Sequence, residues 1–320
     1  MPLFYFWFMV LRHLKSNGIP KKYSFFFSRV LLIVFFLTLN SCNSKNETPL
    51  YLLKGQHFFH ESNLDSAQFY FYKMLDSDSN NAVAINQLAE VHFRKVEIGK
   101  SLLFFNRALS IDSTNEETFF KIAEIKLFLG DYKGVFKNIN KGLKINERKP
   151  KAYFMKGVAF KHVGDTNKAI SSFKTAIELK HDFAKVYYEL GLLLTLRNDP
   201  LAIEYYKRGI EVSPDDAGLK YSLAWSYDRF NNFVEADKAY RNVVSEFPSY
   251  VEAKSNYAVF KYNLNQADTA LLLCNQILED DSLNYSILNL KGTILREKGR
   301  LNESQKIKDK LLLIGSELEF

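Results

Sequence analysis

Cysteine, proline and glycine are all scarce in this sequence. Its 320 residues include 2 Cys, 7 Pro and 14 Gly. Two cysteines are too few for a disulfide-stapled scaffold, and so little Gly and Pro argues against disorder and against a sheet-rich fold. The 28 Phe and 18 Tyr, in contrast, provide ample apolar surface for a packed core. The composition therefore favours an ordered, mainly helical chain.

The sequence also lacks the patterns that mark catalytic sites. It has no Gly-rich phosphate loop, no nucleophile elbow and no paired-Cys zinc pattern. His57, His60 and Glu61 lie close together, but they have neither the metalloprotease spacing nor a second pair of ligands. We therefore predict that the protein is not an enzyme and that it binds no cofactor and no metal ion.

The amino terminus has the order of features that is typical of an export signal. Residues 1–42 contain five basic residues and no acidic one, and a mainly apolar run over 30–39 follows Arg29. At a helical rise of ~1.5 Å per residue, this run covers roughly half of a bilayer core. We therefore expect a cleaved signal and not a transmembrane helix.

The stretch Leu39-Asn40-Ser41-Cys42 resembles the lipobox of bacterial lipoproteins. The resemblance implies a signal peptide over 1–41, cleavage before Cys42, lipid attached to Cys42, and a short linker over 42–47. Acyl chains on Cys42 would anchor the protein to a membrane of the bacterial cell envelope. Asn43 replaces the Asp that marks inner-membrane retention in some bacteria, which favours the outer membrane. The alternative is an ordinary cleaved signal in which Cys42 is incidental.

Cleavage before Cys42 would remove most of the excess positive charge. The full chain has 43 Lys and Arg against 36 Asp and Glu, and five of the basic residues precede Cys42, so 38 remain against 36. A nearly neutral chain lacks the electrostatic footprint of a nucleic-acid-binding protein. We therefore expect no nucleic-acid partner.

The sequence does contain an internal repeat of 34 residues. Counted from Thr48, eight repeats run in register over 48–81, 82–115, 116–149, 150–183, 184–216, 217–250, 251–284 and 285–318. The eighth place is always small: Gly55, Ala89, Ala123, Gly157, Gly191, Ala224, Ala258 and Gly292. Helix axes about 8–10 Å apart leave no room for a large side chain where they cross. This period and this small place predict stacked helical hairpins, one in each repeat.

Two further places support the hairpin assignment. Place 20 is small in most repeats, whereas place 24 carries Phe71, Phe105, Phe173, Tyr206 and Tyr240, with Ile139, Cys274 and Lys308 as departures. We expect the bulky side chains to fill the seam against the following hairpin. The fifth repeat is one residue short at 197–200, where an Asp-Pro pair can start a helix sharply.

These repeats resemble the tetratricopeptide repeat family over residues 48–318. The fourth repeat carries the pattern as Tyr153, Gly157, Phe160, Gly164-Asp165, Ala169, Phe173 and Ala176. In the fifth repeat, the same template is matched by Tyr187, Leu190-Gly191, Ala202, Tyr206 and Pro214. The resemblance implies an all-α fold, a right-handed α-solenoid of eight helix-turn-helix repeats.

In that family, the first helix of each hairpin lines a concave groove. The matching places of this chain are Phe93, Phe120, Phe128, Phe154, Tyr188, Tyr221, Trp225, Arg229 and Tyr262. Aromatic anchors among charged residues suit an extended peptide or a partner helix. The alternative is that several of these aromatic side chains only pack between hairpins.

The sequence thus leads to a lipid-anchored envelope scaffold whose groove binds a protein or peptide partner. One alternative is an envelope lipoprotein that captures a ligand, with the aromatic row stacked on sugar rings. The short connections between the predicted helices favour the scaffold, because glycan-binding members of that group carry long insertions. A second alternative, an accessory subunit of an envelope enzyme complex, remains open.

Overall fold

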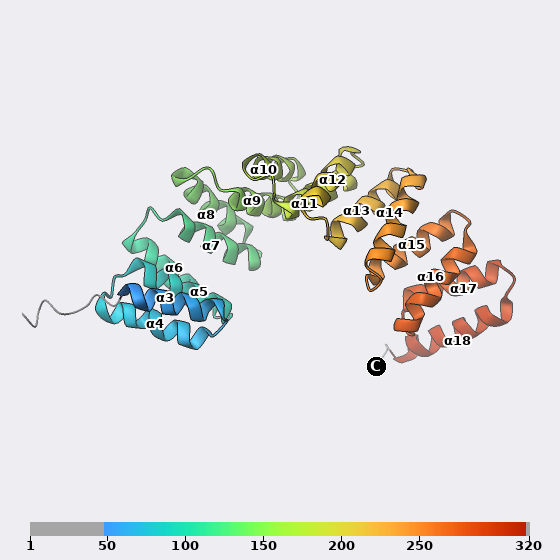
Figure 1. Ribbon diagram of the computed structural model, residues 1–320, viewed down its shortest axis with the longest axis horizontal. Helices are drawn as coiled ribbons and strands as arrows, with labels where there is room; N and C mark the ends of the chain where they lie inside the picture. Colours follow the sequence, from blue (N-terminus) through green and yellow to red (C-terminus); the bar gives the residue numbers. More distant parts are fainter. Residues whose placement is uncertain (1–47, 318–320) are drawn as a thin grey trace, which may run out of the picture. The chain divides into compact units, whose positions relative to one another are not determined.

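The computed structural model describes residues 48–317 (Figure 1). The proposed signal peptide, Cys42 and the linker before Thr48 lie outside the described residues. The described chain divides into two compact units, one ending at Ser113 and one starting at Thr114. The first unit contains α3 (Thr48–His60), α4 (Leu64–Ser77), α5 (Ala82–Arg94) and α6 (Ile98–Ile111).

The second unit contains twelve helices within residues 114–317. They are α7 (Glu116–Phe128), α8 (Tyr132–Ile145), α9 (Pro150–His162), α10 (Thr166–Leu179), α11 (Ala184–Leu196), α12 (Leu201–Val212), α13 (Ala217–Arg229), α14 (Phe233–Glu246), α15 (Val251–Asn263), α16 (Ala267–Asp280), α17 (Tyr285–Glu297) and α18 (Leu301–Glu317). Residues 48–317 contain no helix with both the length and the apolar character needed to cross a bilayer.

The helices pair as predicted. In both units the first helix of each repeat packs against the second, and the second packs against the first helix of the next hairpin of the same unit. The described residues therefore form eight helix-turn-helix repeats, two in the first unit and six in the second, which confirms the predicted all-α solenoid class. The right-handed sense of the stack stays a prediction.

Every hairpin turn uses the same backbone conformation. Place 15 has a positive φ in all eight repeats, at Ser62, Val96, Gly130, Gly164, Asn198, Asn231, Asn265 and Gly299. Gly and Asn tolerate this left-handed region, whereas a β-branched side chain is strained there. Val96 has φ 61° and its side chain is 71% exposed. The turn between α5 and α6 therefore keeps a positive φ at Val96 although valine disfavours it, which means that the flanking helices impose the conformation.

Replacing Val96 with asparagine should stabilise the protein by about 1 kcal/mol, because Asn visits the left-handed region at a lower cost. The exposed valine side chain contributes little packing that would be lost. The reverse change, Gly130→Val, should destabilise it, since Gly130 has φ 71° and open space around its Cα. Urea denaturation of both variants measures the two effects. A destabilised Val96→Asn variant would contradict the assignment of strain to this turn.

Side-chain caps mark the helix starts. The carboxylate or amide oxygens of seven cap residues accept a hydrogen bond from the backbone N–H three residues on: Asn63, Asn81, Asn115, Asp131, Asp165, Asp216 and Asn284. In the shortened fifth repeat, Asp199 instead accepts from the N–H of Leu201 at 3.0 Å, and Pro200 lies between them in helical conformation. The predicted sharp start is present, and α12 begins one residue later than a proline at the first helical position would give.

The small eighth place receives an aromatic ring from its own hairpin. A Cβ built on Gly157 would lie 2.5 Å from Cε1 of Phe173, and one on Gly191 would lie 2.6 Å from Cε1 of Tyr206. These rings therefore lie directly on the glycine backbone. The side chains at place 24 also reach the next hairpin as predicted, since Tyr240 lies 5.6 Å from the ring of Tyr257. The side chain at place 24 therefore fills both the helix crossing of its own hairpin and the seam against the next hairpin.

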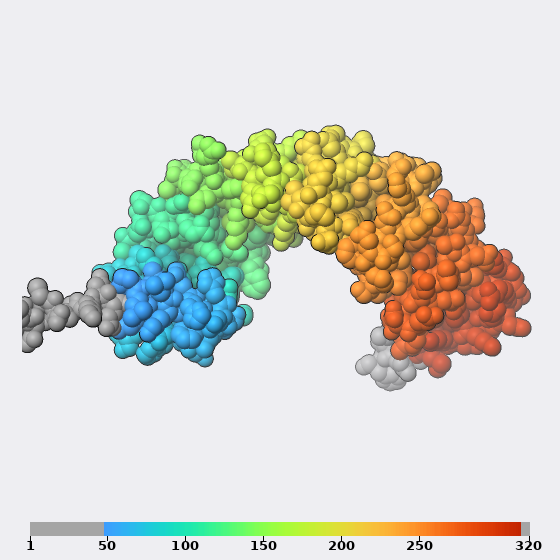
Figure 2. Space-filling model, in the orientation of Figure 1, coloured from blue at the N-terminus to red at the C-terminus, as the bar shows by residue number. Residues whose placement is uncertain are grey.

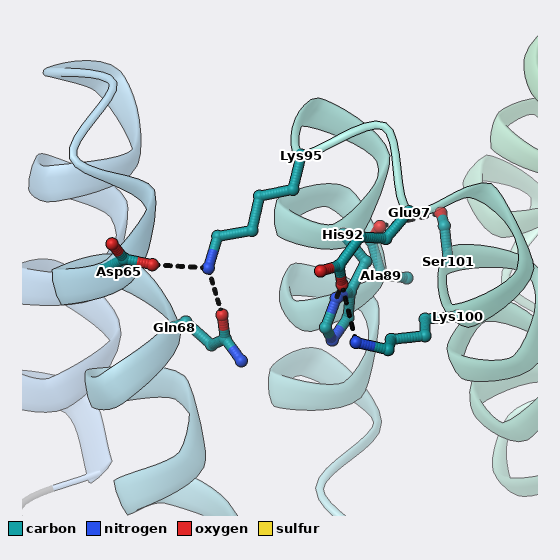
Figure 3. Close-up of polar contacts among 8 residues, drawn as sticks. All are labelled: Asp65, Gln68, Ala89, His92, Lys95, Glu97, Lys100 and Ser101. Atoms are coloured by element: carbon teal, nitrogen blue, oxygen red, sulfur yellow. Dashed lines mark hydrogen bonds and ion pairs between the residues drawn. The ribbon is translucent and has the colours of Figure 1, made fainter.

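Polar contacts join the hairpins of the first unit (Figure 3). The Lys95 ammonium, at the end of α5, donates to Asp65 of α4 at 2.6 Å. In the turn after α5, Glu97 contacts His92 Nδ1 at 2.6 Å, and this hydrogen bond is the main reason that the pKa of Glu97 lies below its usual range. Ser101 donates to the carbonyl of Ala89 at 2.8 Å. A serine is thus accommodated at place 20 because it satisfies its hydroxyl across the helix crossing.

Candidate functional site

The first helices of the second unit line one face of it. Four pairs of successive first helices contact one another: α7 with α9, α11 with α13, α13 with α15, and α15 with α17. Within residues 114–317, no pair of second helices approaches as closely. The first helices therefore lie on the inner side of this unit, and the second helices lie outside them (Figures 1 and 2). We use "inner face" for the surface of α7, α9, α11, α13, α15 and α17.

Three of the predicted groove residues lie near the amino-terminal end of the described chain. Phe93 is half-buried on α5, in the first unit, and Phe128 ends α7 with 69% of its surface exposed. Phe120 is only 5% exposed, which corrects its assignment as a groove residue. Gly142 has no side chain, and a Cβ there would lie 2.5 Å from Cε1 of Phe120. The Phe120 ring occupies that space and is a core residue.

Phe154 and Tyr188 lie at the seams between hairpins. The ring of Phe154 is 5.3 Å from that of Phe183 and 5.9 Å from that of Phe173. Tyr188 is half-buried against the core of hairpins four to six. Aromatic neighbours cover much of the Phe154 ring. Its environment therefore fits the alternative in which the side chain only packs between hairpins. Tyr188 keeps an exposed portion next to the tyrosines of α13.

A tyrosine and asparagine cluster connects α13 with α15. The Asn256 amide donates to the Tyr221 hydroxyl at 2.7 Å, and the Tyr250 ring packs edge-on against Tyr221 at 5.5 Å. Burial, followed by the nearby Glu252 carboxylate, raises the pKa of both tyrosines. The Tyr221 hydroxyl is thus held between Asn256 and Glu252, which fixes the position of its ring.

Trp225 and Arg229 project from the next turns of α13. The Arg229 guanidinium lies 5.8 Å from the centroid of the Trp225 ring, and its Nε donates to the Thr195 carbonyl at 3.1 Å and to the Asn198 amide oxygen at 3.0 Å. These bonds hold Arg229 in place against α11, and its side chain is exposed. A tryptophan next to a positioned arginine is a typical anchor of a protein-binding surface.

Asp228 precedes Arg229 and is half-buried. Burial raises the pKa of its carboxyl group, and its carboxylate has no ion-pair partner among residues 48–317. In the next hairpin, the hydroxyl of Tyr262 on α15 donates to Glu297 of α17 at 2.8 Å. The inner face from α11 to α17 thus combines aromatic surface with a positioned cation and an unpaired carboxylate.

The structure therefore brings Tyr188, Tyr221, Trp225 and Arg229 together on neighbouring helices. The groove assignment from sequence left out three neighbours of this group, namely Tyr250, Glu252 and Asn256. Asn256 follows Tyr221 by 35 residues, one more than the repeat, so a search at the repeat spacing plus or minus one would have paired them.

Comparison with known proteins agrees with this architecture. Residues 150–183 and residues 220–250 each match a family model described as "Tetratricopeptide repeat". These two stretches coincide with the fourth and sixth hairpins, which are therefore similar to tetratricopeptide repeats. A curated Caenorhabditis elegans relative, "Tetratricopeptide repeat-containing protein trd-1", is 28% identical over 120 residues, which cover 37% of this chain. The match spans 16% of that relative's length.

Several solved structures share the fold at low sequence identity. The Pseudomonas aeruginosa protein pilF is 17% identical with a TM-score of 0.59, covering 68% of this chain and 97% of its own. A tetratricopeptide repeat protein from Parabacteroides merdae is 16% identical with a TM-score of 0.54, covering 78% and 99%. PilW, described as a widely conserved type IV pilus biogenesis factor, is 18% identical with a TM-score of 0.53, covering 61% and 91%. At these identities the likeness concerns the fold.

Proposed function

We propose that this tetratricopeptide repeat protein is a non-enzymatic scaffold that is anchored to the bacterial cell envelope by lipid on Cys42. Its inner face, centred on α11 to α15, binds an extended peptide or a helix of a partner protein. The observation that carries the binding site is the group of Tyr221, Trp225 and Arg229. These side chains are positioned by neighbouring helices and remain partly exposed.

The chemistry of this group indicates what the partner should offer. Tyr221 and Tyr250 offer aromatic surface for an apolar side chain, and the Tyr250 hydroxyl can donate a hydrogen bond to a carbonyl oxygen of a bound backbone. Arg229 suits a carboxylate, and the unpaired Asp228 suits a basic side chain or an N–H group. A peptide that presents apolar, acidic and basic side chains in turn would satisfy all three.

The anchor is supported by the residues around Cys42. The basic, apolar and small residues that precede it have the order of a lipoprotein signal. Acyl chains contribute ~0.8 kcal/mol per buried methylene group, so more than one chain gives stable membrane binding. Asn43, the residue after Cys42, favours the outer membrane over the inner membrane. The connections between helices of residues 48–317 are short, which favours a scaffold over a glycan-binding lipoprotein.

The experiment that tests this function is crosslinked capture of partners from membranes. The chain carrying Trp225→Ala and Arg229→Ala should recover about tenfold less of a discrete partner protein than the unchanged chain, because aromatic and Arg anchors dominate such interfaces. Lys238→Ala is the matched control, since Lys238 is exposed on the outer helix α14. Equal recovery from the groove variant and the control would exclude the inner face as the binding site.

The same strains test the anchor. Cys42→Ala should move the protein from the membrane pellet to soluble fractions, while the groove variant should remain in the pellet. Persistence of the Cys42→Ala protein in the pellet would refute lipid anchoring and leave the scaffold function untouched. Binding of labelled oligosaccharides by the unchanged chain, without capture of a protein, would instead favour the ligand-capturing alternative.

A further inference from the structure

The outer side of the second unit has a hollow with an aromatic floor. It lies between α8, α9 and α10 and has a volume of about 440 Å³. The rings of Phe136 and Phe160 form its floor, with their centroids 4.4 Å apart. Asn140 and Ser171 lie at its edge. Its walls come from two hairpins of the same unit, so the hollow belongs to the packed stack and is separate from the inner face.

Two lysines line this hollow. Lys168 lies 5.4 Å above the Phe160 ring and is paired with Asp165 at 2.7 Å. Lys156 is half-buried and has no ion-pair or hydrogen-bond partner among residues 48–317. An ammonium group without a carboxylate partner is available to pair with an acidic group of a ligand.

The surface around the hollow is strongly basic. Residues 132–179 contain eleven Lys and Arg against three Asp and Glu. Three of these basic residues, Lys149, Lys151 and Lys161, pair with glutamates outside this range. Helix α8 has no acidic residue, and its four lysines, Lys133, Lys137, Lys141 and Lys144, are all exposed. Because the part of the chain from Cys42 onward is nearly neutral, this concentration of positive charge is local. Such a patch attracts negatively charged partners and raises their association rate.

We propose that the hollow between α8, α9 and α10 is a second docking site, which takes an acidic peptide segment bearing one large apolar side chain. The apolar side chain enters the hollow and packs on Phe136 and Phe160. A neighbouring carboxylate pairs with Lys156, and further acidic residues face the lysines of α8.

The geometry favours this occupant over other anionic partners. A membrane surface is flat, and it would contact the exposed lysines of α8 without reaching the half-buried rings below them. A bound peptide can insert a side chain into the hollow and at the same time place carboxylates at its rim. This site is distinct from the inner face, so a partner there leaves the proposed groove open.

The test uses the full chain in detergent and a fluorescein-labelled peptide in which acidic residues flank one phenylalanine. Fluorescence anisotropy should show binding that weakens about tenfold when the phenylalanine of the peptide is replaced by serine. Lys156→Glu should weaken binding by about tenfold or more, because it places a like charge against the peptide carboxylate. Lys174→Glu, an exposed change of the same charge on α10, should have a much smaller effect.

Two results would overturn the proposal. Equal weakening by Lys156→Glu and Lys174→Glu would mean that only diffuse charge attracts the peptide. Stronger binding to anionic phospholipid vesicles or to an oligonucleotide than to the peptide would assign the basic surface to a different partner. Trp225→Ala should leave peptide binding unchanged, so this outcome is independent of the inner-face function. Circular dichroism of each variant confirms that the helices remain folded.

Discussion

Replacing Gly157 with leucine should lower the free energy of unfolding by about 3 kcal/mol, since it overfills a packed core. The Phe173 ring lies on the Gly157 backbone, and even a single added Cβ would be 2.5 Å from its Cε1 atom. Phe173 is fully buried and contacts Phe154, so it has no free space to move into. The two helices of the fourth hairpin would have to separate.

The matched control is Gly99→Ala. Gly99 also lies within a helix, but no atom of its surroundings lies within 4 Å of a Cβ built there. Because alanine is the better helix former, this change should stabilise the protein by about 0.5–1 kcal/mol. Chemical denaturation followed by circular dichroism compares the two variants. A Gly157→Leu variant as stable as the unchanged protein would show that the ring does not hold the two helices together.

Tyr240→Ala should cost about 4 kcal/mol, as expected for an aromatic side chain deleted from a core. Tyr240 is fully buried at the crossing of α13 and α14. Its ring lies 5.6 Å from that of Tyr257 and 5.5 Å from that of Phe260, so its removal leaves a cavity that neighbouring rings cannot fill. The loss would loosen the hairpins that carry Tyr221 and Trp225.

Tyr240→Phe should behave in the opposite way. The Tyr240 hydroxyl is buried and has no hydrogen-bond partner among the described residues, and burial raises its pKa well above the usual range. Removing a buried, unsatisfied hydroxyl while keeping the ring should be neutral or stabilising by about 1 kcal/mol. Calorimetry of the two variants separates the ring from the hydroxyl. Strong destabilisation by Tyr240→Phe would mean that the hydroxyl does have a partner in solution.

The fold could be predicted from the sequence because its physical requirements recur every 34 residues. A place such as that of Gly157 needs a small residue wherever two helices cross, and the turn at Gly164 needs a residue that tolerates a positive φ. Eight repetitions make such requirements visible even where single repeats depart from them. Val96 is such a departure, and the turn keeps its shape there because the adjoining helices fix it.

The candidate site was less predictable, because it depends on which neighbour a side chain meets. Phe120 and Tyr188 hold the same place in their repeats, yet Phe120 is buried because Gly142 makes room for it. The bond between Asn256 and Tyr221 joins two repeats and depends on the offset between them. The hollow next to Lys156 needs three helices to form. Periodicity gives the place of a residue in its own repeat but not the contents of the adjacent one.

The side-chain ties between repeats on the inner face have a mechanical consequence. Arg229 is bonded to α11, Asn256 to α13 and Tyr262 to α17, so the fifth to eighth hairpins are joined to one another along the inner face. In a stack whose repeats touch only their neighbours, these side-chain contacts resist the bending of one hairpin against the next. A ligand bound across these contacts would add further links between the hairpins. It would therefore make the inner side of the stack more resistant to bending.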